Sequence, residues 1–94
     1  MRLNGKISTI PAKIYTCDKV QGVEMVSIRF NNTIAYNITL SKFDKKANQT
    51  IELYTLNLDA GDTVTDSFPY QLSEGDSLIA FASVAKTTYS LVIK

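Results

Sequence analysis

Acidic side chains gather around two Gly-Asp turns, and their type and spacing make them the first candidates for chemistry in this chain. The two turns are Asp59-Ala60-Gly61-Asp62 and Ser73-Glu74-Gly75-Asp76. A calcium loop needs carboxylates at alternating positions, so that several oxygens converge on one ion. The acids of this chain are not spaced in that way. We therefore interpret both turns as corners of a β-chain, in which glycine supplies a positive φ and the acid bonds back to the turn backbone.

Other catalytic chemistry is limited by the composition of the chain. There is no histidine and a single cysteine, Cys17. The residues needed for a Cys/His zinc site and for Ser-His or Cys-His catalysis are therefore absent. Cys17 is expected to be a small buried residue at a strand end. A glycosidase pair of Glu52 or Glu74 with Asp76 would need a cleft that such a small chain hardly forms. We expect no enzyme activity, no cofactor and no metal.

Charge and length narrow the range of partners. Ten basic and nine acidic residues give a net charge of +1, which favours neither nucleic acid nor an anionic membrane as partner. The N-terminus lacks the apolar run of a signal peptide, and no segment has the length of a membrane span, which favours synthesis in a cytoplasm. A domain of this size buries roughly two-thirds of its unfolded surface. Contacts with partners would therefore add to a modest stability.

Apolar residues recur at every second position along most of the chain, which is the period of a half-buried β-strand. Strands are expected at residues 6–10, 13–17, 23–30, 34–41, 50–58, 68–72, 77–83 and 87–93. This pattern predicts an all-β fold, a single antiparallel β-sandwich of the jelly-roll or immunoglobulin-like kind with about seven to eight short strands. One domain is expected over residues 1–94, with residues 1–10 as an added strand or an intersubunit arm.

Two details of the pattern predict local structure. Asn31-Asn32 stands between two alternating segments, and asparagine tolerates the positive φ of a tight turn, so these segments are expected to pair as a hairpin. In residues 50–58 the apolar phase slips by one position near Tyr54. A β-bulge or a strand that bends from one sheet to another would cause this slip.

The same alternation separates a core from an outward face. The side chains expected to be mostly buried are Val26, Ile28, Phe30, Ile34, Tyr36, Ile38, Leu40, Leu53, Leu56, Leu78, Ala80, Leu91 and Ile93. The side chains expected to face solvent or an interface are Ser27, Arg29, Asn37 and Thr39.

A combination of short segments runs from residue 12 to the end of the chain. Its parts are Ile14-Tyr15-Thr16-Cys17, the asparagine-containing turn, the two Gly-Asp turns with their flanking leucines, and Ala82-Ser83. This combination resembles small structural proteins of tailed-bacteriophage virions. The resemblance implies a compact β-sandwich that decorates a capsid or lies in a neck, tail or baseplate. It also implies an oligomer, with a trimer favoured, and it implies no catalytic residue.

The sequence therefore favours a non-enzymatic virion structural protein that acts through protein–protein assembly with itself and with other virion proteins. The alternative is a carbohydrate- or receptor-binding sandwich, in which Tyr54 and Tyr70 would form an exposed platform for a glycan. Contacts with partners are expected in residues 3–10 and around the turns of residues 59–66. The candidate interface residues are Leu3, Lys6, Ile7, Ile10, Tyr54, Asp59, Asp62 and Tyr70.

Overall fold

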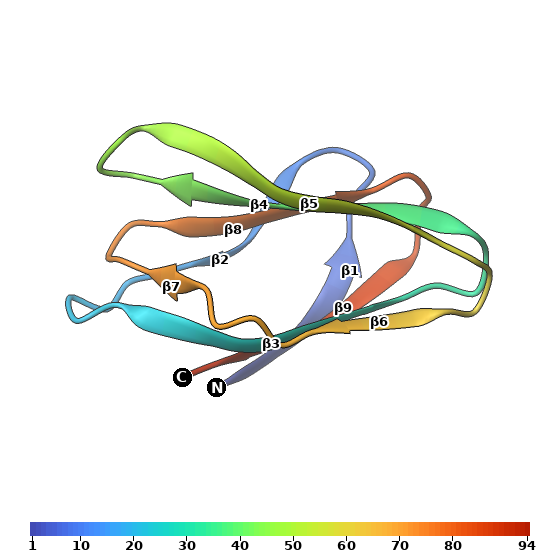
Figure 1. Cartoon of the computed structure of the whole chain (residues 1–94), viewed down its shortest axis with the longest axis horizontal. Coiled ribbons are helices and arrows are strands. Elements are labelled where there is room, and N and C mark those ends of the chain that lie inside the picture. Colours follow the sequence, from blue (N-terminus) through green and yellow to red (C-terminus); the bar gives the residue numbers. More distant parts are fainter.

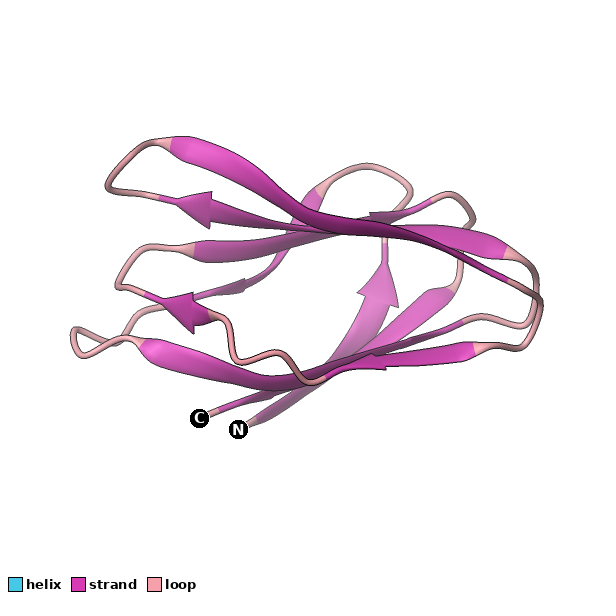
Figure 2. Ribbon diagram, in the orientation of Figure 1, coloured by secondary structure: helices cyan, strands magenta, loops and turns pink.

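The computed structural model describes the whole chain, Met1–Lys94, and contains strands and loops without any helix (Figure 2). No helix is therefore present that could cross a membrane. The nine strands are β1 (Arg2–Ile7), β2 (Ala12–Thr16), β3 (Val23–Asn31), β4 (Tyr36–Asp44), β5 (Gln49–Leu58), β6 (Thr63–Asp66), β7 (Gln71–Leu72), β8 (Ser77–Ala82) and β9 (Thr87–Ile93). They form two antiparallel sheets that pack face to face (Figure 1). The expected all-β sandwich is confirmed.

The strand order identifies the sandwich as a jelly roll. Sheet A has the order β1-β9-β3-β6, with β7 paired to the start of β3, and sheet B has the order β2-β8-β4-β5. Short connections at residues 8–11, 32–35, 59–62 and 83–86 each join a strand of one sheet to a strand of the other. This alternation gives the two Greek keys of a jelly roll. It also leaves β1 and β2 at one lateral edge of the sandwich, and β5 and β6 at the opposite edge.

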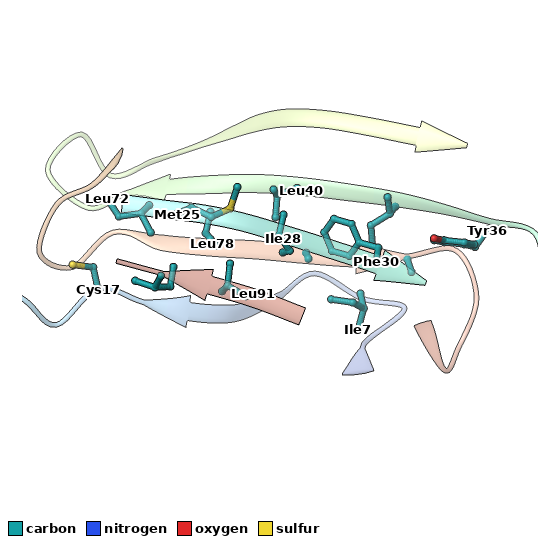
Figure 3. Close-up of a cluster of buried hydrophobic side chains, with 14 residues drawn as sticks. Ile7, Cys17, Met25, Ile28, Phe30, Tyr36, Leu40, Leu72, Leu78 and Leu91 are labelled. Atoms are coloured by element: carbon teal, nitrogen blue, oxygen red, sulfur yellow. The ribbon is translucent and has the colours of Figure 1, made fainter. Parts of the chain in front are cut away.

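A continuous apolar core fills the space between the sheets, as Figure 3 shows. Most of the expected core is confirmed as buried: Ile28, Phe30, Tyr36, Ile38, Leu40, Leu78, Ala80, Leu91 and Ile93. Leu53 and Leu56 are half-buried and pack against this core. Full burial of a side chain of this size contributes about 1.5–3 kcal/mol. The core therefore provides most of the force that holds the two sheets together.

Two expected core residues are exposed, and one expected surface residue is buried. Val26 is 39% exposed because a bulge between Met25 and Ser27 shifts the phase of β3, and Met25 takes the buried position. Ile34 is 53% exposed because it lies in the connection between β3 and β4. Thr39 is buried because β4 lies between β5 and β8, and its Oγ1 shares a hydrogen bond of 2.9 Å with another threonine hydroxyl, on β5.

The expected hairpin between β3 and β4 is wrong, because β3 belongs to sheet A and β4 to sheet B. Asn32 holds the crossing connection through its buried side chain. Its Nδ2 donates to the carbonyl oxygen of Ala85 at 3.1 Å and to Oγ1 of Thr87 at 2.9 Å. Its Oδ1 accepts from the backbone N–H of Thr33 at 2.7 Å. Neither asparagine of the pair has a positive φ, so Asn32 acts as a clamp between two loops.

The phase slip expected near Tyr54 is confirmed as a β-bulge. Leu40 pairs with Tyr54 and Ser41 pairs with Glu52, so Leu53 is the extra residue of β5. A bulge places two residues opposite one and moves the following side chains to the other face. Leu53 and Tyr54, although adjacent in the strand, can thereby both pack against the core.

Three strand positions differ from those expected. The first strand covers Arg2–Ile7 in place of residues 6–10, since residues 8–11 form the connection that ends at Pro11. The strand expected at residues 68–72 is reduced to Gln71–Leu72, because Pro69 has no N–H for a sheet ladder. The short edge strand β6 was not expected, because its four residues contain a single apolar side chain and show little periodicity.

Candidate assembly edges

Both Gly-Asp turns are corners, as the sequence predicts. Gly61 and Gly75 have φ values of 79° and 90°. The carboxylate of Asp62 accepts from the backbone N–H of Asp59 at 3.3 Å, and that of Asp76 accepts from the N–H of Ser73 at 3.0 Å. No group of three or more His, Cys, Asp or Glu side chains is placed to hold a metal ion. The acids Asp62 and Asp76 therefore stabilise the backbone of their own turns.

Asp76 also connects two neighbouring turns at one end of the sandwich. Its buried carboxylate accepts from the backbone N–H of Lys45 at 3.0 Å and lies 3.8 Å from Nζ of Lys42. Hydrogen bonds to a charged acceptor are stronger than those between neutral groups. Asp76 thereby ties the turn of residues 45–48 to the turn of residues 73–76.

Cys17 directly follows β2 and is 1% exposed, which confirms the expected small buried residue at a strand end. Its Sγ lies 3.6 Å from the carbonyl oxygen of Lys19. A thiol in this position is covered by the fold on all sides.

The two lateral edges are the places where the sandwich leaves backbone unpaired. Edge strands present N–H and C=O groups that another strand can pair with. We call the side that carries β1 and β2 the β1/β2 edge, and the opposite side the β5/β6 edge. Both edge strands of sheet B carry an irregularity in the ladder, β2 between Lys13 and Tyr15 and β5 beside Leu53. Such irregularities restrict which segments of an edge can accept a further strand.

The β1/β2 edge is basic. Arg2 and Lys6 on β1 and Lys13 on β2 are all exposed, and residues 1–17 contain no acid. Nζ of Lys13 lies 5.5 Å from the ring centroid of Phe43, in a cation–π contact. The N-terminal amine donates to the carbonyl oxygen of Ile93 at 2.9 Å, and the two chain ends lie side by side in Figure 1.

The β5/β6 edge is acidic. Glu52 on β5 and the turn residues Asp59 and Asp62 are exposed, and Asp66 on β6 is half-buried. Residues 47–85 contain no lysine and no arginine. The sandwich therefore carries opposite charge on its two open edges, although its net charge is only +1.

Two tyrosines and an acid meet on the β5/β6 edge. Burial, and after it the negative charge of Asp66, raises the pKa of Tyr54 and the pKa of Tyr70. Oη of Tyr54 and Oδ2 of Asp66 are buried without a hydrogen-bond partner of good geometry, while Oδ1 of Asp66 accepts from the N–H of Phe68 at 2.9 Å. Both tyrosines are half-buried. They do not form the exposed glycan platform that the alternative function needs.

The structure divides the expected interface residues between the two edges. Leu3, Lys6, Ile7 and Ile10 belong to β1 and the connection after it, and Tyr54, Asp59, Asp62 and Tyr70 belong to the opposite side. Ile7 is 3% exposed and forms part of the core, because the alternation along β1 turns it inward. Its side chain is therefore not available to a partner, whereas Lys6 and Ile10 are exposed.

Sequence reasoning missed three charged residues of these edges, Arg2, Lys13 and Glu52. The sequence does contain a pattern that could have identified them, because residues 1–17 contain no acid and residues 47–85 contain no lysine or arginine. The topology is needed to show that these two segments supply opposite edges of one sandwich.

The fold and its edges define a small jelly-roll sandwich with two complementary open sides. No protein-family model and no curated protein matches the chain. Among solved structures, the chain is similar to one from Bacillus endospore appendages, described as a novel family of disulfide-linked pili, with a TM-score of 0.53 and 13% identity over 99% of this chain and 80% of that one. At this identity the likeness shows the fold alone. No comparison points to a tailed phage.

Proposed function

We propose that this chain is a non-enzymatic structural subunit that assembles with copies of itself. In this proposal the β1/β2 edge of one copy meets the β5/β6 edge of the next. The opposite charges of the two edges carry the proposal, since like edges would repel and unlike edges attract. Contact between unlike surfaces is heterologous, and it generates a closed ring or an open filament. The likeness to an appendage protein described as forming pili supports a polymerising role.

Backbone pairing would supply most of the affinity of this contact. An added strand extends a sheet through main-chain hydrogen bonds and is a recurring mode of protein recognition. An exposed ion pair contributes only about 0.2–1 kcal/mol. The charges of Lys6, Lys13, Asp59 and Asp62 would therefore select the orientation and the correct pair of edges more than they would strengthen the contact.

The proposed association is non-covalent. The similar appendage pili are described as disulfide-linked, but the single cysteine of this chain, Cys17, is buried under its own fold. A disulfide between copies through Cys17 would require the strand end to open. The edges need no such opening.

A more specific form of this proposal is that the chain is a structural subunit of a phage virion. This form rests on the sequence resemblance alone. A ring of three copies joined by unlike edges would be the trimer that the resemblance favours. Mass spectrometry of purified particles from cells that express the chain tests this form, because a virion part would copurify with other virion proteins.

Charge reversal of each edge tests the assembly itself. One variant carries Lys6→Glu and Lys13→Glu, and the other carries Asp59→Lys and Asp62→Lys. Each variant alone should associate at least about 10-fold more weakly than the native chain in analytical ultracentrifugation, because its two edges then bear the same charge. A mixture of the two variants should assemble again, because each reversed edge then finds an opposite partner.

Lys46→Glu is the matched control, because Lys46 is exposed in the β4–β5 turn and lies on neither lateral edge. This variant should associate like the native chain. Equal loss of association in the control, or no recovery in the mixture, would show that the edges do not recognise each other.

A further inference from the structure

The outer face of sheet A is polar and cationic. Alternation along its strands turns Arg2 and Lys6 of β1 and Arg29 of β3 outward, and all three are exposed. Around Arg29 the outward positions carry amides and hydroxyls, apart from Val92. No carboxylate lines this part of the face. The one outward acid of β3, Glu24, lies at the end that pairs with β7, where its carboxylate accepts from Nε2 of Gln71 at 2.9 Å.

Arg29 lies in the middle of this face and is unpaired. The strand register places Ser90 on one side of it and Thr65 on the other, with Asn4 beyond Ser90. The ion pair of the structure joins Lys42 to Asp76, far from Arg29 in the fold. An unpaired guanidinium offers five N–H donors in a planar fork that fits a carboxylate in a bidentate manner.

Two shallow hollows meet at Arg29. One, of about 380 Å³, extends toward Asn4, Asn31 and Thr88, and the other, of about 240 Å³, extends toward Arg2 and Ser27. Both include Arg29 and Ser90. Together they form a continuous polar trough across the sheet, which suits an extended ligand better than a compact one.

We propose that this trough binds an anionic polysaccharide. Carboxylates of the polymer would pair with Arg29 and, along the trough, with Arg2. The amides of Asn4 and Asn31 and the hydroxyl of Ser90 would bond to the sugar hydroxyls. Charge complementarity favours this occupant, since the trough combines cations with neutral donors and acceptors and contains no acid.

The same face does not fit the other macromolecules that carry negative charge. Single-stranded nucleic acid is usually held by aromatic side chains on which bases stack, and the strand alternation turns no aromatic ring outward here. The ring of Tyr89, at the border of the larger hollow, packs over Gly5 and against the core. A protein partner would need an apolar anchor, and the two hollows contain only Val92 and the border ring of Tyr89 as apolar side chains.

This binding goes beyond the proposed assembly and is separable from it. The centre of the trough, Arg29 and Ser90, lies on the two inner strands of sheet A, β3 and β9, and only its ends reach the edge strands β1 and β6. Assembly through those edges would leave the trough open and repeat it along the polymer. Repetition would raise the avidity for a long polysaccharide without any new contact.

Retention on immobilised polygalacturonate tests the inference, with neutral dextran as the comparison polymer. The full native chain should bind polygalacturonate and not dextran, and the binding should weaken as NaCl is raised. Arg29→Gln should weaken binding at least about 10-fold, since it removes the central fork. The affinity of Arg29→Lys should lie between that of the native chain and that of Arg29→Gln, because lysine keeps the charge without the bidentate geometry. Lys46→Gln, on the opposite sheet, should bind like the native chain.

Arg29→Gln should keep the native melting temperature and the native assembly size, which separates this inference from the proposed function. Four outcomes would overturn it. They are no retention of the native chain, an equal loss with Lys46→Gln, tighter binding to single-stranded DNA than to polygalacturonate, or loss of assembly in Arg29→Gln. The last outcome would make the trough an interface between copies.

Discussion

At the scale of single residues, the two Gly-Asp turns differ in the space around the glycine. A Cβ on Gly75 would meet the side chain of Lys45, whereas a Cβ on Gly61 would meet nothing within 4 Å. Gly61→Ala should therefore lower the free energy of unfolding by about 1 kcal/mol through its positive φ alone. Gly75→Ala should lower it by more, since Lys45 must also move. Urea unfolding of both variants measures the difference, and a smaller loss for Gly75→Ala would contradict the packing argument.

Of the two adjacent asparagines at the end of β3, Asn31 and Asn32, we expect the loss of Asn32 to destabilise the fold more. Asn32→Ala leaves the carbonyl oxygen of Ala85 and the buried hydroxyl of Thr87 without their amide donor, which should cost about 1–3 kcal/mol. Asn31→Ala is the control, because the bond from its Nδ2 to Oγ1 of Thr63, at 2.6 Å, is exposed. Thermal unfolding should show a clearly larger loss for Asn32→Ala, and equal losses would mean that Asn32 is no clamp.

At the scale of elements, the sequence predicts strands better than it predicts their partners. A half-buried strand leaves a local alternation, which is why residues 23–30, 50–58 and 87–93 fall within or close to real strands. The choice of sheet is not local. The hydrogen-bond partners of Asn32, which hold the connection from β3 to β4, lie more than 50 residues away in the chain. No residue next to Asn32 predicts them. The charges of the two edges are visible in the sequence, but their opposition appears only with the topology.

β1 provides an element-scale prediction that revises an expectation from the sequence. If residues 1–10 were an intersubunit arm, as the sequence allows, their deletion would weaken association more than it alters the β-structure of the monomer. In the structure β1 pairs with β9 from Arg2 to Ile7, and Ile7 belongs to the core. Deletion of residues 1–7 should therefore lower the melting temperature by roughly 10 °C or more, since it uncovers β9 and empties a buried site. Circular dichroism melts test this, with Lys6→Gln as the control that keeps the strand.

The meeting of β5 with β6 gives a prediction about pH. Burial and the charge of Asp66 raise the pKa of Tyr54 above its ordinary value of 10.0. The stability contributed by neutral Tyr54 is thus fully present below pH 10, and it is lost as the pH rises above that value, because the unfolded chain ionises first. Tyr54→Phe should change the free energy of unfolding at pH 7 by less than about 0.5 kcal/mol, since the hydroxyl has no partner of good geometry.

The same variant should flatten the fall in stability between pH 10 and pH 12, because phenylalanine cannot ionise. Tyr89→Phe is the comparison, because Tyr89 lies on β9, away from Asp66. Chemical unfolding at several pH values measures both effects. A loss of more than about 1.5 kcal/mol at pH 7 on Tyr54→Phe would instead reveal a hydrogen bond from Tyr54 to Asp66.

At the scale of the whole molecule, the sandwich is a small body with opposite charge on opposite sides. It measures 39 × 24 × 18 Å, so its two lateral edges lie farther apart than the Debye length of about 8 Å at physiological salt. Each edge therefore acts on its own partner, with little influence from the other edge of the same copy. This separation is what allows a single chain to present two complementary surfaces.

Salt should accordingly weaken the association of copies and leave the fold nearly unchanged. Raising NaCl from about 50 to about 500 mM should reduce association several-fold by screening the exposed charges of the edges, while the melting temperature of the monomer moves little because the core is apolar. Sedimentation velocity over a salt series measures this. Association that stays constant or strengthens with salt would contradict the edge contact and point to the outer face of sheet B, where Phe43, Ile79 and Phe81 lie half-exposed away from the core. Substitution of Phe81 by serine would then abolish association, whereas in the edge contact it would leave association intact.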